Sequence, residues 1–118
     1  MGYESRLYVV RKSSTKDENG YWADMIASFN LCCVGNNLLS AIMKAKETDA
    51  YFLEGDSFIY KDKYGEKLKE IPLKEMINMI ANAMQYDDYR RYAPCLALLN
   101  GFNQSEWNNE IVVLHYGY

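Results

Sequence analysis

The sequence contains few of the residues from which most catalytic and metal sites are built. Its one histidine, His115, stands in an apolar C-terminal stretch, so a Ser-His or Cys-His nucleophile pair would have to use it. The three cysteines, Cys32, Cys33 and Cys95, are odd in number and lack CxxC spacing, which disfavours a disulfide framework and a zinc site. We therefore expect reduced, buried thiols, no metal and no catalytic residue.

Phosphate-binding loops and long hydrophobic runs are also missing. The glycines Gly55, Gly65 and Gly101 are isolated, without the GxGxxG or P-loop pattern that cradles phosphate groups. No run approaches the roughly 20 apolar residues of a membrane span, and the polar start Met1–Ser5 lacks the apolar core of a signal peptide. We expect a cytoplasmic protein with no membrane contact and no cofactor.

Positive charge is in short supply, whereas tyrosine is abundant. Thirteen Lys and Arg face sixteen Asp and Glu, which gives a formal charge of −3 and a pI near 5.1. This balance lacks the basic footprint of a nucleic-acid binder, so we expect no direct nucleic-acid contact. The eleven tyrosines suit interfaces as well as half-buried strands, and we assign most of them to strands and core.

The first third of the chain predicts a strand hairpin followed by a helix. Leu7–Val10 is a β-prone run, and the polar segment 13–20 predicts an exposed loop. Alternation of period two over Tyr21–Cys33 favours a second strand paired with the first, although a helix can also be drawn there. Gly35–Asn37 is a break, in which either asparagine can cap a helix running from Leu38 to about Lys46.

The middle of the chain predicts a second hairpin and then the strongest helical signal. Aromatic runs flank the turn at 54–57, and a short strand over Lys67–Ile71 follows a glycine turn at Gly65. Pro72 suits the first turn of a helix, because the N–H it lacks would have no intrahelical partner. Apolar residues then recur at helical spacing on one face, at Leu73, Met76, Ile77, Ile80, Ala81 and Met84.

The last third predicts another helix and a buried strand. Proline interrupts a helix that starts near Asp88, so its regular part is Pro94–Leu99, capped by Asn100-Gly101. Four consecutive apolar residues over Ile111–Leu114 predict a strand buried on both faces in the middle of the sheet. Trp22 and Trp107 are expected in the core.

These elements follow the order ββ-α-ββ(β)-αα-β in a chain of 118 residues, of which 49% are hydrophobic and 25% charged. The order predicts one α+β domain over residues 1–118, with a mixed, mainly antiparallel sheet and about three helices packed on one face.

Two segments are candidates for partner binding. The first can offer stacking planes and bidentate guanidinium contacts, and consists of Tyr86, Asp87, Asp88, Tyr89, Arg90, Arg91 and Tyr92. The same residues could instead cap the next helix, pair along it and enter the core. The second is the tail with Tyr116 and Tyr118, which could add an edge to a partner or form a homodimer through the C-terminal strand.

Carboxylates are the one catalytic group in good supply. Asp62, Glu66 and Glu70 recur with lysines between them, and Glu54 and Asp56 share a hairpin turn. A Mg²⁺ or acid-base site is one interpretation, and a solvated, charge-balanced face is the interpretation that the interspersed lysines favour. A carboxylate-metal-dependent hydrolase is accordingly the last of our three functional hypotheses.

The opening MGYESRLYVV, residues 1–10, resembles the start of a group of short proteins encoded by phages and prophages of Gram-positive bacteria, and the segment Glu70–Leu73 fits the same group. The resemblance implies a small accessory protein without a catalytic motif, of a kind that often binds and blocks a host protein, including CRISPR nucleases. Our leading hypothesis is a non-enzymatic, phage-derived protein that binds a host or phage protein as an anti-defence, anti-CRISPR-like inhibitor. The alternative is a nucleotide-signal-binding module, in which tyrosines stack a base and Arg90 or Arg91 meets phosphate.

Overall fold

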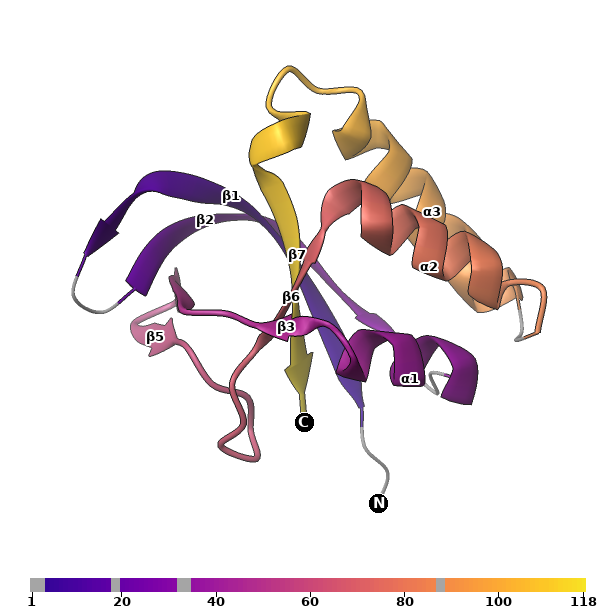
Figure 1. Ribbon diagram of the computed structural model, residues 1–118, viewed down its shortest axis with the longest axis horizontal. Coiled ribbons are helices and arrows are strands. Elements are labelled where there is room, and N and C mark those ends of the chain that lie inside the picture. Colours follow the sequence, from indigo (N-terminus) through magenta and orange to yellow (C-terminus); the bar gives the residue numbers. More distant parts are fainter. Residues whose placement is uncertain (1–3, 18–19, 32–34, 87–88) are drawn as a thin grey trace.

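The computed structural model describes residues 4–17, 20–31, 35–86 and 89–118 (Figure 1). Within these ranges the chain forms seven strands, three helices and one short 3-10 helix. The strands are β1 Ser5–Asp17, β2 Gly20–Leu31, β3 Lys46–Glu47, β4 Ala50–Glu54, β5 Ser57–Ile59, β6 Lys69–Pro72 and β7 Ile111–Gly117. The helices are α1 Asn36–Met43, α2 Leu73–Ala83, α3 Tyr89–Asn103 and the 3-10 helix η1 Asn108–Glu110.

All the strands belong to one sheet, in the order β3-β6-β7-β1-β2-β4-β5. Neighbouring strands are antiparallel except β2 and β4, which pair in parallel through Tyr21 with Ala50 and Trp22 with Tyr51. This confirms the predicted mixed, mainly antiparallel sheet of an α+β fold.

The long β1–β2 hairpin confirms the strand interpretation of the ambiguous second segment. The register runs from Ser5 opposite Leu31 to Asp17 opposite Gly20, with irregularities after Val9 and Lys12. The exposed loop predicted over 13–20 is therefore wrong for residues 13–17, which belong to β1. Backbone hydrogen bonds between strands can extend a hairpin without apolar side chains. Cys32 and Cys33 lie outside the described residues.

Strand β7 confirms the prediction of a buried strand in the middle of the sheet. It pairs with β1 along its whole length, from Arg11 opposite Ile111 to Ser5 opposite Gly117, and with β6 on its other side. Its apolar residues pack on both faces: Val113 belongs to the core under the helices, and Leu114 to a second core on the opposite face.

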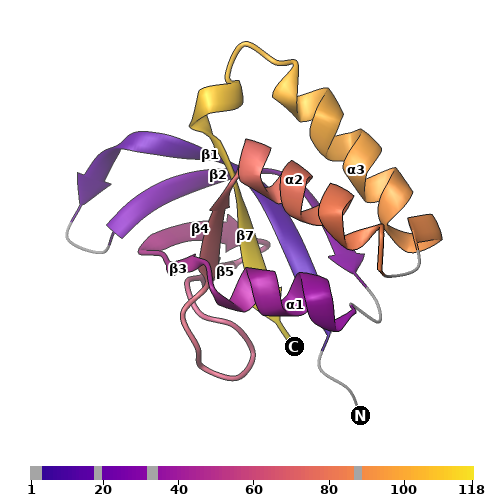
Figure 2. The same cartoon turned by 45° about the vertical axis from the view of Figure 1, so that its right-hand side comes forward.

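The three helices cover one face of the sheet, as predicted (Figures 1 and 2). Leu7 and Val9 of β1 and Val113 of β7 meet the buried stripe of the helices there. That stripe consists of Leu38, Ile42, Leu73, Met76, Ile80, Ala83, Tyr92 and Leu99. In α2 it includes Ala83 and leaves Ala81 exposed, a small correction to the predicted stripe.

The opposite face of the sheet curls around a second core. The rings of Tyr8 in β1 and Phe52 in β4 lie 4.6 Å apart between centroids, although β2 separates their strands in the sheet. Ala23, a small buried residue of β2, belongs to the same cluster. Direct contact between strands that are not neighbours requires the sheet to bend here, so β4 and β5 turn away from the helices.

Two helix boundaries differ from the predictions. The N-cap of helix α1 is Gly35 and both asparagines lie within the helix, which ends at Met43, before β3 begins at Lys46. Helix α3 continues through Pro94 to Asn103 instead of ending at Leu99. A proline near the start of a helix removes only one hydrogen bond, and the apolar contacts of later turns hold the rest of α3. The predicted cap at Asp87 or Asp88 lies outside the described residues.

Candidate functional site

An exposed group of large apolar side chains lies on the β2–β4–β5 end of the sheet. Alternation along β4 sends Phe52 into the second core, so its neighbours Tyr51 and Leu53 point to the opposite face. Leu53 lies opposite Phe58 in the β4–β5 hairpin, and Trp22 lies opposite Tyr51 in the parallel pair. We call Trp22, Tyr51, Leu53, Phe58 and Tyr60 the aromatic surface.

This surface is open to solvent to an unusual degree. Phe58 is 59% exposed, Tyr60 58% and Leu53 43%, while Trp22 and Tyr51 are partly buried. Large apolar side chains that lie singly on a surface need no explanation, whereas a contiguous group of them marks a contact site in most proteins. The arrangement therefore identifies this end of the sheet as the leading candidate site.

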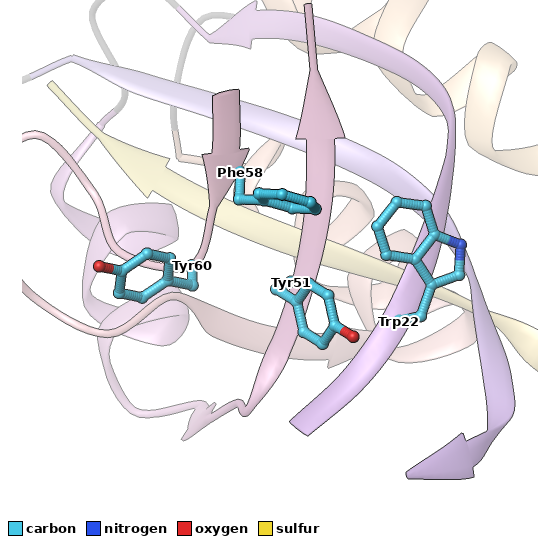
Figure 3. A pocket seen from close by; sticks show the side chains of 4 residues that line it. All are labelled: Trp22, Tyr51, Phe58 and Tyr60. Carbon is cyan, nitrogen blue, oxygen red and sulfur yellow. The ribbon is translucent and has the colours of Figure 1, made fainter. Parts of the chain in front are cut away.

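The aromatic rings are fixed by one another. Trp22, Tyr51 and Phe58 meet edge to face in all three pairs, with centroids 5.6 to 6.3 Å apart. The indole Nε1 of Trp22 also donates a hydrogen bond of 2.8 Å to Asp24 Oδ1. Together with Tyr60 these rings line an open hollow of about 670 Å³ (Figure 3). Rings held in this way lose little rotamer freedom when a partner covers them.

Gly20 brings the strands of the aromatic surface together. Its φ of 122° is rarely adopted by other residues, and a Cβ atom at this position would lie 1.9 Å from the carbonyl oxygen of Asp49. The same oxygen accepts a hydrogen bond from the Tyr21 N–H at 3.2 Å. The absent side chain thus lets the start of β2 approach the chain that leads into β4.

The face that carries the aromatic surface is the one the helices cover elsewhere. Asp24 lies opposite Arg11, and Arg11 lies opposite Ile111, whose side chain packs in the helix-covered core. Trp22 stands two residues before Asp24 and so shares its face. In Figure 1 β5 lies at the left and the helices at the right, and the exposure of Leu53, Phe58 and Tyr60 shows that this part of the face is uncovered.

Exposed carboxylates border the aromatic surface, and the two basic side chains beside Trp22 are paired with other acidic residues. Asp24 shares a face with Trp22 in β2, and Asp56 lies in the β4–β5 turn, whereas Glu54 shares the opposite face with Phe52 and interacts with Tyr8. Arg11 Nε contacts Glu110 Oε2 at 2.7 Å, and its guanidinium covers the ring of Trp107. Lys12 Nζ lies 3.1 Å from both carboxylate oxygens of Glu70.

The first predicted partner-binding segment, residues 86–92, is split between surface and core. Tyr86 is 69% exposed and Arg90 is exposed, whereas Tyr92 is buried and its hydroxyl accepts a hydrogen bond of 2.9 Å from the Gly35 N–H. Tyr92 is therefore a core residue and we remove it from the candidate surface. Asp87, Asp88 and the side chains of Tyr89 and Arg91 lie outside what the structure describes.

The C-terminal tyrosines pack against the first strand. The Tyr116 ring meets Tyr8 edge to face at 6.1 Å, and the Arg6 guanidinium lies 5.1 Å above the Tyr118 ring. The backbone of Tyr118 exchanges hydrogen bonds of 2.8 and 3.0 Å with Glu4. Because β7 has a neighbour on each side, it offers no open edge to a second subunit, and the predicted homodimer stays untested.

The histidine has a serine partner, but both side chains are buried. Ser5 Oγ and His115 Nε2 lie 2.8 Å apart across neighbouring strands. Burial lowers the pKa of His115 to about 4, so the ring is neutral near pH 7. A catalytic serine must be accessible to its substrate, whereas the Ser5 side chain is buried. The contact between Ser5 and His115 is therefore a packing contact.

The carboxylates singled out for metal chemistry have structural partners. Asp62 Oδ1 accepts hydrogen bonds from the N–H groups of Tyr64 and Glu66, at 2.8 and 3.0 Å. Burial of Glu70 opposes its ionisation, but the Thr48 hydroxyl and Lys12 outweigh burial and hold its pKa below the usual value. Among the described residues, no group of three or more His, Cys, Asp or Glu side chains is placed to hold a metal ion.

The two tryptophans correct the expectation that both lie in the core. Trp107 is 50% exposed beneath the Arg11 guanidinium, and Trp22 lines the open hollow. One pattern in the sequence could have predicted the aromatic surface. The stretch Ala50–Leu53 has apolar residues at every position, so whichever residues face outward on a sheet edge must expose apolar area.

Comparison with known proteins adds no assignment. No family model, curated protein or solved structure gives a significant match to this chain. In the part of the chain that the structure describes, every helix is too short or too polar to cross a lipid bilayer.

Proposed function

We propose that this protein is a non-enzymatic accessory protein of phage origin, which acts in the host cytoplasm by binding a host or phage protein. The observation that carries the proposal is the aromatic surface, which supplies the contact area. Exposed Phe58 and Tyr60 are of the residue types enriched at protein interfaces. The resemblance of residues 1–10 to phage and prophage proteins supports the origin.

The geometry favours a protein partner over a small ligand. Leu53, Phe58 and Tyr60 are largely exposed and the hollow beside them is open, whereas small-molecule sites usually surround most of their ligand. Rigid aromatic anchors on an open surface are the residues that dominate binding energy in protein interfaces.

A narrower form of the proposal is an anti-defence inhibitor, of the anti-CRISPR kind, that blocks a host nuclease. The formal charge of −3 and the exposed carboxylates at Asp24 and Asp56 support it. Nucleases bind polyanions through basic surfaces, so an aromatic contact bordered by carboxylates complements the surface that such an inhibitor has to cover.

The test is an affinity capture from a Gram-positive host lysate, with and without nuclease treatment, read by mass spectrometry. We compare the unchanged protein with the double variant Phe58→Ser and Tyr60→Ser. The control is Tyr64→Ser, which removes a similarly exposed aromatic ring, 54% exposed, from the loop between β5 and β6, outside both candidate surfaces. We expect one dominant partner that survives nuclease treatment, is retained by the control, and binds the double variant roughly tenfold or more weakly.

Two results would contradict the proposal. Equal capture by the double variant and the unchanged protein would remove the aromatic surface as the contact site. Loss of the partner on nuclease treatment would indicate binding through a nucleic acid, contrary to a direct protein contact.

The hollow itself favours a second candidate function, recognition of a nucleotide signal. Its volume of about 670 Å³ and its aromatic lining suit a stacked base. Arg11 and Lys12, which lie beside Trp22, are engaged by Glu110 and Glu70, and Arg90 stands on α3, away from β5 (Figure 1). We therefore expect no thermal upshift with nucleotides and cyclic dinucleotides. An upshift that Trp22→Leu abolishes would favour this function instead.

A further inference from the structure

The β5 strand ends the sheet with an unoccupied edge. It is the last strand in the order of the described sheet and pairs with β4 only. An edge strand presents backbone N–H and C=O groups to whatever lies beside it, which is why extended segments of other chains add to sheets at such positions.

The hairpin register specifies which backbone groups point outward. Glu54 and Ser57 flank a two-residue turn in which Gly55 has a φ of 62°, so this flanking pair is hydrogen-bonded. Hydrogen-bonded and non-bonded pairs alternate in an antiparallel ladder, which makes Leu53 and Phe58 a non-bonded pair. The N–H and C=O of Phe58 therefore point to the open side of β5.

The side chains next to this edge indicate the chemistry of an added strand. In an added strand, alternate side chains would lie on the face that carries Phe58 and Tyr60, both more than half exposed. Aromatic faces attract cations, and Asp56 places an exposed carboxylate in the hairpin turn beside Phe58, whereas Glu54 lies on the opposite face with Tyr8. An arginine or lysine in the added strand would meet both kinds of group.

We propose that the β5 edge accepts an extended, basic segment of the partner protein as an additional strand, with an Arg or Lys side chain against Phe58 and Tyr60. This inference rests on the proposed function, since it specifies how the partner binds at the aromatic surface. Main-chain hydrogen bonds with Phe58 set the position and direction of the added strand. The cationic side chain determines which segments bind.

The experiment is an NMR titration of the full chain with three short peptides at millimolar concentration. The probe is acetyl-Thr-Arg-Thr-Arg-Thr-amide. One comparison peptide carries Glu in place of Arg, and the other has N-methylated backbone amides that cannot pair with a strand. We expect the Arg peptide to shift the Phe58 and Ile59 amide signals, to slow hydrogen exchange at Phe58, and to bind about tenfold more tightly than either comparison peptide.

The variants separate this inference from the proposed function. Phe58→Thr keeps a strand-forming residue but removes the ring, so it should weaken binding of the Arg peptide, whereas Tyr64→Thr should not. Equal binding of the N-methylated peptide overturns strand addition, and equal binding of the Glu peptide overturns the cationic preference. No binding of the Arg peptide overturns the inference as a whole. The proposed function fails separately, through the lysate capture.

Discussion

The two edges of this sheet are built in opposite ways. Strand β3 has two residues, Lys46 and Glu47, both charged and exposed, whereas β5 carries Phe58 in an exposed position. Behind β3, Glu70 is buried and held by Lys12 and Thr48. Charged, short edges prevent strands from pairing with other chains, and an exposed aromatic edge invites such pairing. The contrast shows that the two edges differ in chemistry, and it is the basis of our proposal that a partner adds to β5.

Titratable groups also distinguish the two ends. Beside β3, a hollow of about 350 Å³ is lined by charged residues, among them Glu47 and Lys69, together with His115. At the β5 end the hollow is lined by aromatic rings. The stability contributed by the β3 end should therefore depend on pH. The stability contributed by the β5 end should depend on substitutions that change the packing of backbone and side chains.

The largest effect is expected from Gly20→Ala, which breaks the β5 end. The new Cβ atom would overlap the carbonyl oxygen of Asp49, and the φ of 122° would strain any residue other than glycine. Backbone strain and overpacking together predict a loss of about 3 to 4 kcal/mol in the free energy of unfolding. Urea denaturation measures this loss, and Gly101→Ala, at an open helical position, is the control.

The same variant should separate Trp22 from Tyr51, whose contact depends on the parallel pairing of β2 with β4. Trp22 fluorescence reports this change against the unaltered signal of Trp107 in single-tryptophan backgrounds. A stable Gly20→Ala protein with unchanged fluorescence would show that β2 and β4 do not need this close approach.

A smaller effect is expected at the β3 end, from the titration of His115. Its pKa is lowered to about 4 from 6.5, mainly by burial, so the unfolded state takes up a proton more readily than the folded state. This contribution to stability is complete above pH 6.5 and is lost as the pH falls towards 4. The shift corresponds to about 3 kcal/mol at roughly 1.4 kcal/mol per unit.

The measurement is the free energy of unfolding from pH 7.5 to 4 for the unchanged protein and for His115→Gln. The difference between the two curves isolates the histidine from the carboxylates that titrate in the same range. Parallel curves would mean that the folded protein protonates His115 as readily as the unfolded chain does.

The smallest effect on stability is expected from Phe58→Ser. The ring is 59% exposed, and its contacts with Trp22 and Tyr51 account for less than about 1 kcal/mol of stability. Its neighbour Ile59 packs against the second core, so Ile59→Ser should cost about 2 kcal/mol. Thermal and urea unfolding compare the two. A cost for Phe58→Ser equal to that of Ile59→Ser would show that the aromatic surface serves the fold rather than a partner.

Elements whose patterns are local could be predicted from the amino-acid sequence. Four consecutive apolar residues at Ile111–Leu114 predicted the interior strand, and the spacing from Leu73 to Ile80 predicted α2, because side-chain direction repeats every 2 or 3.6 residues along one chain. The fold class followed from the order of these elements.

Tertiary structure alone decided the site. Trp22 meets Tyr51 through a parallel pairing of segments far apart in the chain, and the curl that brings Phe52 to Tyr8 turns Phe58 outward. Tyr92 became a core residue and Trp107 a surface residue for the same reason. Periodicity tells which residues share a face of an element, but only the packing of distant elements decides which face is covered.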